Sequence, residues 1–376
     1  MEIYFDNAAT TKLDPQALEA MMPFLKDDFG NSASIHKKGV RATEAVEKSR
    51  KILADKIKAE PEEIIFTSGG TESNNFAIKA AAFANQDKGK HIVTSQIEHS
   101  CVYNSCKWLE KQGFEITYLK PDNHGFINPE DVKKALRPDT ILVSIIHGHN
   151  ELGVIQDLEG LGRVCKNVIF HSDACQSFTR ENIDSQKQNF DLLTLNAHKI
   201  NGPKGVGALY IRKGTRIGPW QSGGGHEKGM RAGTLNVPGI VGFAKAVELA
   251  DSKKDVDYVA QLKNRLKKGI EEINGIKINS SKCDLPHILS VTFPGLEGEA
   301  LLESFSLDGL YISTGSACSS HNLQPSRTLL AIGLYPQEAN STIRFSLNRM
   351  NTKEEVDEAI SIIENNVKRL RKISPF

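Results

Sequence analysis

Between residues 60 and 213, short β-rich runs alternate with segments of helical pattern, and this alternation limits the possible folds more than any other feature. The β-rich runs cover residues 63–67, 91–95, 115–119, 140–146, 167–171, 192–195 and 207–211, and helical patterns cover 72–84, 101–112, 129–136 and 158–165. The alternation predicts an α/β fold with a mainly parallel seven-stranded sheet and helices on both faces. Because ligands of such folds bind beyond the carboxyl ends of the strands, we expect functional residues there.

The alternation of β-rich and helical segments ends in the last third of the chain. A long charged stretch that favours helix covers residues 237–272, strand-like segments follow at 288–293 and 341–347, and a final helical pattern covers 353–371. This change predicts a large domain at residues 13–254. We expect residues 1–12 and 255–376 to form a second, smaller α+β domain.

Composition argues against several classes of protein. Lys and Arg total 47 and Asp and Glu total 46, so the formal net charge of +1 leaves no electrostatic footprint for nucleic acid or an anionic membrane. No apolar run approaches the roughly 18 residues of a membrane span, and the first residues lack the features of a secretory signal. The six cysteines form no CxxC pair, which argues against a zinc site or a disulfide scaffold. We therefore expect a cytoplasmic protein with no metal, no direct nucleic-acid partner and no membrane contact.

Polar residues follow four of the expected strands. Gly70 and Thr71 come after 63–67 and open a helix, His99 comes after 91–95, Asp173 after 167–171 and Lys199 after 192–195. Taken singly, each has an ordinary structural explanation: a capped turn, a loop histidine, a helix cap and a surface lysine. Taken together and in this order, they match a pyridoxal phosphate site with a phosphate loop, a ring-stacking histidine, a carboxylate for the ring nitrogen and a Schiff-base lysine.

Specific motifs extend this match along nearly the whole chain. They are Tyr-Phe-Asp-Asn-Ala-Ala-Thr-Thr at 4–11, Gly-Asn-Ser-Ala-Ser at 30–34, Thr-Ser-Gly-Gly-Thr-Glu-Ser-Asn-Asn at 67–75, Glu-His at 98–99, Ser-Asp-Ala-Cys-Gln at 172–176, Ala-His-Lys-Ile-Asn-Gly-Pro-Lys-Gly at 197–205, Arg-Ala-Gly-Thr at 231–234, Thr-Gly-Ser-Ala-Cys-Ser at 314–319 and Ile-Arg-Phe-Ser at 343–346. In this combination the sequence resembles the cysteine desulfurases of the NifS/IscS type, within the class V aminotransferase superfamily. The resemblance implies a fold-type I pyridoxal phosphate enzyme.

The resemblance also implies roles for residues around the cofactor ring. Lys199 is implied to form the Schiff base with the cofactor and to move the α-proton of the substrate. Asp173 is implied to pair with the ring nitrogen and Gln176 to bond the ring oxygen. His99 is implied to be catalytic, stacking on the ring and shuttling protons. Asn150 is implied to lie close to both the cofactor and the substrate carboxylate.

For the cofactor phosphate, the resemblance implies binding by Gly70, Thr71 and His198. Asn196 stands where the family usually has serine, and its amide can donate to a phosphate oxygen as a hydroxyl does. Thr234 is implied to reach the phosphate bound by the partner subunit, which implies a homodimer with shared sites. A second departure is His149, at a position where the family usually has asparagine.

Arg344 and Cys318 are the residues implied to act on the substrate. Arg344 would clamp the carboxylate through its planar guanidinium. Cys318 has small neighbours, and the pattern of residues 313–320 predicts a flexible loop. Both features suit a cysteine that acts as an exposed thiolate. The alternative is a loop thiol without a chemical role. The implied reaction converts L-cysteine to L-alanine and leaves a persulfide on Cys318. The implied partner is a sulfur-acceptor protein such as an iron–sulfur scaffold, serving cluster assembly or tRNA thiolation.

Three other functions compete with this interpretation. An aminotransferase is disfavoured by Cys318, because transamination needs no nucleophile. A non-catalytic assembly platform is disfavoured because Lys199, Asp173 and Cys318 are all intact. A selenocysteine lyase could share every motif, so that alternative stays open.

Overall fold

The central sheet appears in the structure, a computed structural model that describes residues 1–250, 253–280, 285–314 and 324–373. Its strands are β2 (Ile64–Thr67), β3 (His91–Ser95), β4 (Glu115–Leu119), β5 (Thr140–Ser144), β6 (Ile169–Asp173), β7 (Leu192–Asn196) and β8 (Gly207–Ile211). Their order across the sheet is β2-β8-β7-β6-β5-β3-β4. Strand β8 runs antiparallel to β2 and β7, and the other neighbouring pairs are parallel. The predicted α/β class with a mainly parallel seven-stranded sheet is therefore confirmed.

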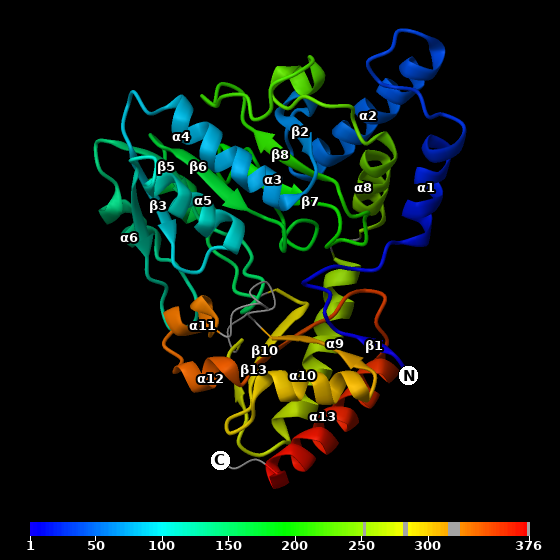
Figure 1. Cartoon of the computed structure of the whole chain (residues 1–376), viewed down its shortest axis with the longest axis vertical. Helices are drawn as coiled ribbons and strands as arrows, with labels where there is room; N and C mark the ends of the chain where they lie inside the picture. Colours follow the sequence, from blue (N-terminus) through cyan, green and yellow to red (C-terminus); the bar gives the residue numbers. More distant parts are fainter. Residues whose placement is uncertain (251–252, 281–284, 315–323, 374–376) are drawn as a thin grey trace.

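Helices cover both faces of this sheet (Figure 1). One face carries α2 (Lys37–Lys56), α6 (Pro129–Ala135), α7 (Leu158–Val164) and α8 (Val237–Leu249), and α1 (Pro15–Lys26) packs on α8. The other face carries α5 (Ser100–Glu110) and a continuous helical stretch made of α3 (Gly70–Asn75), η2 (Phe76–Ala80) and α4 (Ala81–Ala84).

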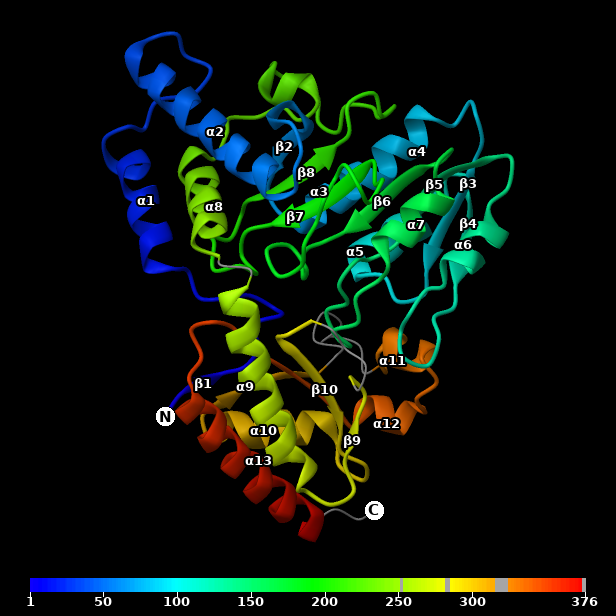
Figure 2. The ribbon, with the colours of Figure 1, turned by 180° about the vertical axis from the view of Figure 1, so that it is seen from behind.

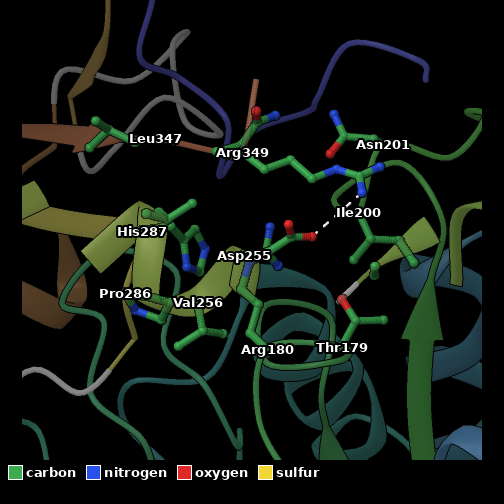
Figure 3. Close-up of a pocket in the computed structure, with 13 residues that line it drawn as sticks. Thr179, Arg180, Ile200, Asn201, Asp255, Val256, Pro286, His287, Leu347 and Arg349 are labelled. Atoms are coloured by element: carbon green, nitrogen blue, oxygen red, sulfur yellow. Dashed lines mark hydrogen bonds and ion pairs between the residues drawn. The ribbon is translucent and has the colours of Figure 1, made fainter. Parts of the chain in front are cut away.

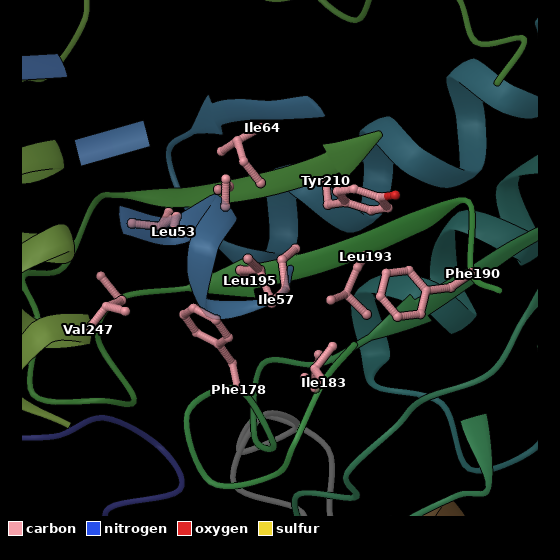
Figure 4. Packing of buried hydrophobic residues seen from close by; sticks show 14 of the residues in the cluster. Leu53, Ile57, Ile64, Phe178, Ile183, Phe190, Leu193, Leu195, Tyr210 and Val247 are labelled. Atoms are coloured by element: carbon pink, nitrogen blue, oxygen red, sulfur yellow. The ribbon is translucent and has the colours of Figure 1, made fainter. Parts of the chain in front are cut away.

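Two apolar cores follow from the alternation of side chains along the strands. Ile64 and Phe66 of β2 belong to the core on one face, while Ile65 belongs to the core on the other. In Figure 4, Leu193 and Leu195 of β7 lie within the first of these cores. Packing on both faces fixes the strands, so the backbone of the residues that directly follow each strand is fixed as well.

A smaller second part lies below the sheet in Figure 1 and has its own core. Its four-stranded antiparallel sheet has the order β12 (Ser313–Thr314), β13 (Thr342–Ser346), β10 (Ile288–Thr292), β9 (Lys277–Ile278). Its helices are α9 (Lys254–Glu271), α10 (Gly298–Leu307), α11 (Arg327–Ala331), α12 (Pro336–Asn340) and α13 (Lys353–Ile373), and α9 packs along α13 (Figure 2).

The N-terminal segment joins this second part. Strand β1 (Ile3–Tyr4) pairs with β11 (Leu310–Tyr311), and the Ile3 and Phe5 side chains pack in the second core. Two short 3-10 elements belong to the larger part, η1 (Pro61–Glu63) directly before β2 and η3 (His226–Gly229) after β8. The exact domain boundaries, at 12/13 and 254/255, stay predictions.

Two local expectations need correction. The sequence predicts a loop from residue 313, but Ser313–Thr314 form β12, in which Ser313 pairs with Arg344 because the edge of β13 offers free backbone groups. The stretch 237–272, expected to favour helix throughout, contains two separate helices, since Ala250 leaves the helical conformation at ψ 104°. Within the described part of the chain, no helix combines the length and the apolar character needed to cross a membrane.

Candidate active site

A cavity of about 500 Å³ opens at the carboxyl ends of β6 and β7. Its wall includes many of the residues singled out in the sequence: Gly70, Thr71, His99, Asn150, Asp173, Gln176, Asn196, His198, Lys199 and Arg344. Thr234 is exposed and does not line the cavity of its own chain. Cys318 lies outside the described residues. We call this space the catalytic cavity.

The turn that carries Lys199 follows β7 and is held from two sides. Arg180 Nη2 donates to the Lys199 carbonyl at 2.6 Å. Thr11 Oγ1 donates to the His198 carbonyl at 2.8 Å and accepts the Asn201 N–H, also at 2.8 Å. Asn201 has φ 64°, a left-handed conformation that asparagine tolerates better than most residues. These bonds fix the backbone of Lys199 while its side chain borders the catalytic cavity.

The Asp173 carboxylate is buried where β6 ends. It accepts the Asn74 side-chain N–H at 2.6 Å and the Cys175 backbone N–H at 2.9 Å. Burial by itself raises the pKa of Asp173, but the charge that the His99 ring carries at acidic pH, the Cys175 N–H and the Lys199 ammonium outweigh burial and hold the pKa below its usual value. Asp173 is therefore an anion at neutral pH, which is the state that pairs with a protonated ring nitrogen.

His99 stands at the N-terminus of α5 and caps that helix. Its Nδ1 accepts the Cys101 backbone N–H at 3.3 Å and lies 2.9 Å from Cys101 Sγ. Burial, assisted by the charge of Lys199, lowers the pKa of His99 to about 4. The ring is therefore neutral, and because Nδ1 accepts, its proton is on Nε2. A neutral imidazole fixed at a helix start is suited to lie against an aromatic cofactor.

The other end of the catalytic cavity has the shape that a phosphate group requires. Gly69 has φ 151°, a conformation that favours glycine, and leads directly into α3. A Cβ on Gly70 would lie 2.6 Å from Cys175 Sγ, so this close approach of helix start and β6 loop needs glycine. The N–H groups of the helix start and the Thr71 hydroxyl border the cavity, where they can receive an anion.

Asn196 and His198 complete this end with polar atoms that the chain itself leaves largely unused. Asn196 Oδ1 is buried without a hydrogen-bond partner among the described residues, and Asn196 Nδ2 lies 3.5 Å from His198 Nε2, at the limit of a hydrogen bond. His198 Nδ1 contacts Thr10 Oγ1 at 3.2 Å. Burial, followed by the charges of Lys199 and Lys204, lowers the pKa of His198 to about 4. The donors at this end are the Asn196 Nδ2 hydrogens and the single N–H of the neutral His198 ring, and with the glycine-shaped wall they fit the phosphate of pyridoxal phosphate, whereas Asn196 Oδ1 can only accept.

Arg344 reaches the catalytic cavity from β13, in the second part of the molecule. Its Nη2 donates to Asp6 Oδ1 at 2.8 Å and its Nη1 donates to the Asn150 carbonyl at 3.1 Å. Its Nε is buried and has no partner among the described residues. A ligand carboxylate that bonds both Nε and Nη2 of this guanidinium takes the place of Asp6 at Nη2.

Gln176 is also buried, and both ends of its side-chain amide are engaged. Nε2 donates to the Ala8 carbonyl at 2.9 Å, and Oε1 lies 3.0 Å from His287 Nε2. An amide nitrogen carries two hydrogens, so one N–H of Gln176 remains for a ligand in the cavity.

Some residues that shape the site are not assigned a role by sequence reasoning. Asn74, which bonds Asp173, lies three residues after Thr71 on the same helix face, and that spacing is a usable signal. Asp6 pairs with Arg344, which lies 338 residues further along the chain, and the local sequence around either residue does not predict the contact. Cys101 lines the cavity, but burial raises the pKa of its thiol to about 12, so it stays protonated at neutral pH.

The ligand atoms of His99, Cys101 and Asp173 lie within 4.8 Å of one another, as metal ligands do. The Asn74 amide nitrogen bonds both Cys101 Sγ, at 3.1 Å, and Asp173, at 2.6 Å. The three groups therefore already have partners within the protein. The expectation of no metal stays a prediction.

Known proteins share both the fold and the length of this chain. The family model described as aminotransferase class-V matches residues 3–359. A cysteine desulfurase IscS from Dictyoglomus turgidum is 46% identical over 381 residues, covering 100% of this chain and 97% of the relative, and one from Methanosarcina thermophila is 46% identical over 379 residues, covering 100% and 94%. Among solved structures, a NifS-like protein has a TM-score of 0.93 at 37% identity over 98% of this chain and 100% of that one. The structure of SspA in complex with cysteine has a TM-score of 0.85 at 40% identity, covering 93% and 100%. The chain therefore belongs to the class-V aminotransferase family of pyridoxal phosphate enzymes and, within that family, to the cysteine desulfurases.

Proposed function

We propose that this cysteine desulfurase binds and converts L-cysteine in the catalytic cavity, with Lys199, Asp173, His99 and Arg344 as its working residues. The observation that carries the proposal is their convergence on one space at the ends of β6 and β7. A buried anion, a lysine and an arginine with an unused N–H meet there. This arrangement supports binding of a zwitterionic amino acid beside a cofactor with a basic ring nitrogen.

Residues in the cavity wall have the chemistry to bind the ring nitrogen, the phenolic oxygen and the phosphate of pyridoxal phosphate. When bound, the cofactor supplies an electron sink that makes the Cα proton of the substrate acidic. The residues proposed to hold it are Asp173 at the ring nitrogen, Gln176 at the phenolic oxygen, and Gly70, Thr71, Asn196 and His198 at the phosphate.

The residues of the chain then orient the substrate and move one proton. Arg344 binds the substrate carboxylate in place of Asp6 and so directs the Cα–H bond. Lys199 Nζ takes the proton from the substrate Cα and later returns one, from a turn held by Arg180 and Thr11. The neutral ring of His99 adds no positive charge that would oppose a protonated ring nitrogen.

Sulfur transfer is assigned to Cys318 on the strength of its sequence motif. Its thiolate attacks the Sγ atom of the substrate, an S–S bond forms as the Cβ–Sγ bond breaks, and the three-carbon remainder takes up a proton to become L-alanine. The persulfide that results stays on Cys318. The buried thiols of Cys101, Cys106 and Cys165 have pKa values raised to about 12 by burial, so they are poor competitors as nucleophiles.

The test compares wild-type protein with Cys318→Ser, using Cys165→Ala as a matched control in the apolar core. With L-cysteine and a reductant, the wild type and Cys165→Ala should release L-alanine and sulfide. Cys318→Ser should release essentially none while still binding the cofactor and changing its absorbance when L-cysteine is added. Mass spectrometry that finds the extra sulfur on another cysteine would contradict the assignment. Parallel assays with L-selenocysteine decide whether the open lyase alternative applies.

The assembly, partner and location are part of the same proposal. We propose a homodimer in which Thr234, exposed on its own chain, reaches the phosphate bound by the partner. Exposed apolar side chains near the start of α2, Phe29 at 70% and Ile35 at 98%, support coverage by a second chain.

We propose an iron–sulfur scaffold as the sulfur acceptor, with tRNA thiolation as the second route. We also propose a cytoplasmic location, which is supported by free thiols at Cys101, Cys106, Cys165 and Cys175.

A further inference from the structure

His287 links the second part of the molecule to the catalytic cavity without lining it. The residue directly precedes β10, and its carbonyl accepts the Leu347 N–H at 2.9 Å, which fixes its backbone beside the end of β13. Its side chain is 0% exposed, and its Nε2 lies 3.0 Å from Gln176 Oε1. The contact therefore connects β10 with the loop that follows β6.

The direction of this hydrogen bond follows from the neighbouring groups. The Ala8 carbonyl can only accept, so the amide nitrogen of Gln176 faces Ala8 and Oε1 faces His287. An oxygen at that place requires His287 Nε2 to carry the proton. Burial, followed by nearby cationic groups, keeps the pKa of His287 well below its usual value, so the ring is neutral; those groups are Arg180, Lys263, Arg344 and Lys199.

A small cavity of about 40 Å³ lies on the far side of the same loop, between the two parts of the molecule, and we call it the joint cavity (Figure 3). His287, Arg180, Asp255 and Arg349 border it. Arg180 Nη1 donates to the Gln176 carbonyl at 3.0 Å while its Nη2 holds Lys199. Gln176 is thus held at its backbone by Arg180 and at its side chain by His287.

We propose that His287 is a positioning residue that fixes the side-chain amide of Gln176, so that the remaining N–H of the amide is directed to the phenolic oxygen of the cofactor. The inference rests on the proposed role of Gln176 and adds to it the residue that sets its orientation. Without the donor on His287, Gln176 Oε1 would be a buried acceptor lacking a partner, and the amide would turn to find one. The N–H would then leave the phenolic oxygen.

The expected signature is spectroscopic. A hydrogen bond to the deprotonated oxygen favours that charged form, so its loss raises the pH at which the absorbance of the bound cofactor changes. A role of His287 in packing alone would lower the unfolding temperature and leave this midpoint unchanged.

The experiment titrates the absorbance of the cofactor-loaded dimer from pH 6 to pH 10 in wild type and variants. His287→Leu removes the donor at similar volume, and we expect the midpoint to rise by about one pH unit, a tenfold change in protonation ratio. His287→Gln keeps a donor at nearly the same reach and should restore the wild-type midpoint. Gln176→Leu should give the same rise, and the double variant His287→Leu/Gln176→Leu no further rise.

An unchanged midpoint in His287→Leu, or shifts that add in the double variant, would overturn the proposal. If His287→Leu fails to fold, His287→Asn takes its place, because its shorter amide cannot reach Gln176 and the same rise is expected. Wild-type protein that shows no cofactor absorbance at all would reject the proposed function together with this inference. Normal wild-type absorbance with unchanged His287 variants would reject the inference alone.

Discussion

The two ends of the catalytic cavity differ in how firmly the chain holds the groups proposed to meet the cofactor. At the ring end, Asp173 accepts two hydrogen bonds and the Gln176 amide is bonded at both of its ends. At the end proposed for the phosphate, the Asn196 amide nitrogen makes only one contact among the described residues, 3.5 Å to His198 Nε2, so its N–H groups are largely unused. In the proposed arrangement, the groups at the ring end are held in place before the cofactor arrives, and those at the phosphate end gain their partner only when it binds. Changes at the ring end should therefore alter chemistry, and changes at the phosphate end should alter retention of the cofactor.

The largest effect is expected at Lys199, which lines the same cavity. With Lys199 in the role proposed for it, Lys199→Ala removes both the covalent attachment and the group that moves the Cα proton, so activity should fall to background. Borohydride should fix the cofactor to the wild type and not to the variant, as measured by absorbance after unfolding and by peptide mapping. Lys204→Ala is the matched control, because Lys204 also lines the cavity and its variant should still be labelled at Lys199. Label found on Lys204 in the wild type would refute the assignment.

The next effect tests the ring end. Asp173→Asn keeps the shape of the side chain and removes the charge, and we expect kcat/KM to fall about a hundredfold or more, roughly 2.7 kcal/mol of transition-state stabilisation. Asn74→Ala removes one hydrogen bond to Asp173 and should cost about 1 kcal/mol, roughly fivefold. Cofactor affinity should change little in Asn74→Ala. Equal losses of activity in the two variants would contradict the proposal, because the negative charge of Asp173 and the hydrogen bond from Asn74 would then contribute equally to activity.

A smaller effect is expected from Thr234, which tests whether the phosphate end is shared. Loss of one charge-assisted hydrogen bond in Thr234→Ala should weaken cofactor affinity by about 1.5–3 kcal/mol, roughly ten- to a hundredfold, with unchanged ring absorbance. Titration of the cofactor-free protein measures it.

A mixed dimer of Thr234→Ala and Lys199→Ala subunits sharpens the same point. It pairs an intact Lys199 with an intact Thr234 from the other chain, so one site should bind with wild-type affinity. Weak binding at every site of the mixed dimer, or a fully active monomer in sedimentation, would show that Thr234 acts within its own chain or not at all.

The smallest effect is expected at Asn196. If its amide donates to the phosphate, Asn196→Ser should keep cofactor affinity within a few-fold, whereas Asn196→Ala should lose about 1 kcal/mol, roughly fivefold. Equilibrium titration of the three proteins resolves a difference of that size. Equal affinities for all three would mean that the phosphate is held by the other groups alone.

Local patterns were sufficient to predict the sheet and its helices, because side-chain alternation and helical spacing are local properties. Strand ends were less accurate: β6 runs on to Asp173, two residues beyond the run inferred from apolar character, since Ser172 and Asp173 are polar yet paired in the sheet. The antiparallel direction of β8 was not predicted either. Only the short connection from Lys199 to Gly207 hints at it.

The pairwise contacts behind the site could not be predicted from the sequence. His287 and Gln176 are 111 residues apart, and their contact depends on how the two parts of the molecule meet. The departure at His149 has an explanation that only the structure provides. Its Nδ1 accepts the Glu151 and Leu152 N–H groups and its Nε2 donates to the Ile97 carbonyl at 2.8 Å, so the buried ring holds a turn together.

The bond between Arg344 and Asp6 has a consequence for turnover. With Arg344 in the role proposed for it, Asp6 is a tethered competitor that occupies the arginine whenever no amino acid does. L-Cysteine and L-alanine carry the same carboxylate, so both must displace Asp6 on arrival and both are displaced by it on departure. Such competition weakens the binding of the substrate in its ground state and in its transition state by the same amount. It therefore raises KM and leaves the rate of the chemical step unchanged. The enzyme would thereby release L-alanine faster, but it would bind L-cysteine less well at low cysteine concentrations.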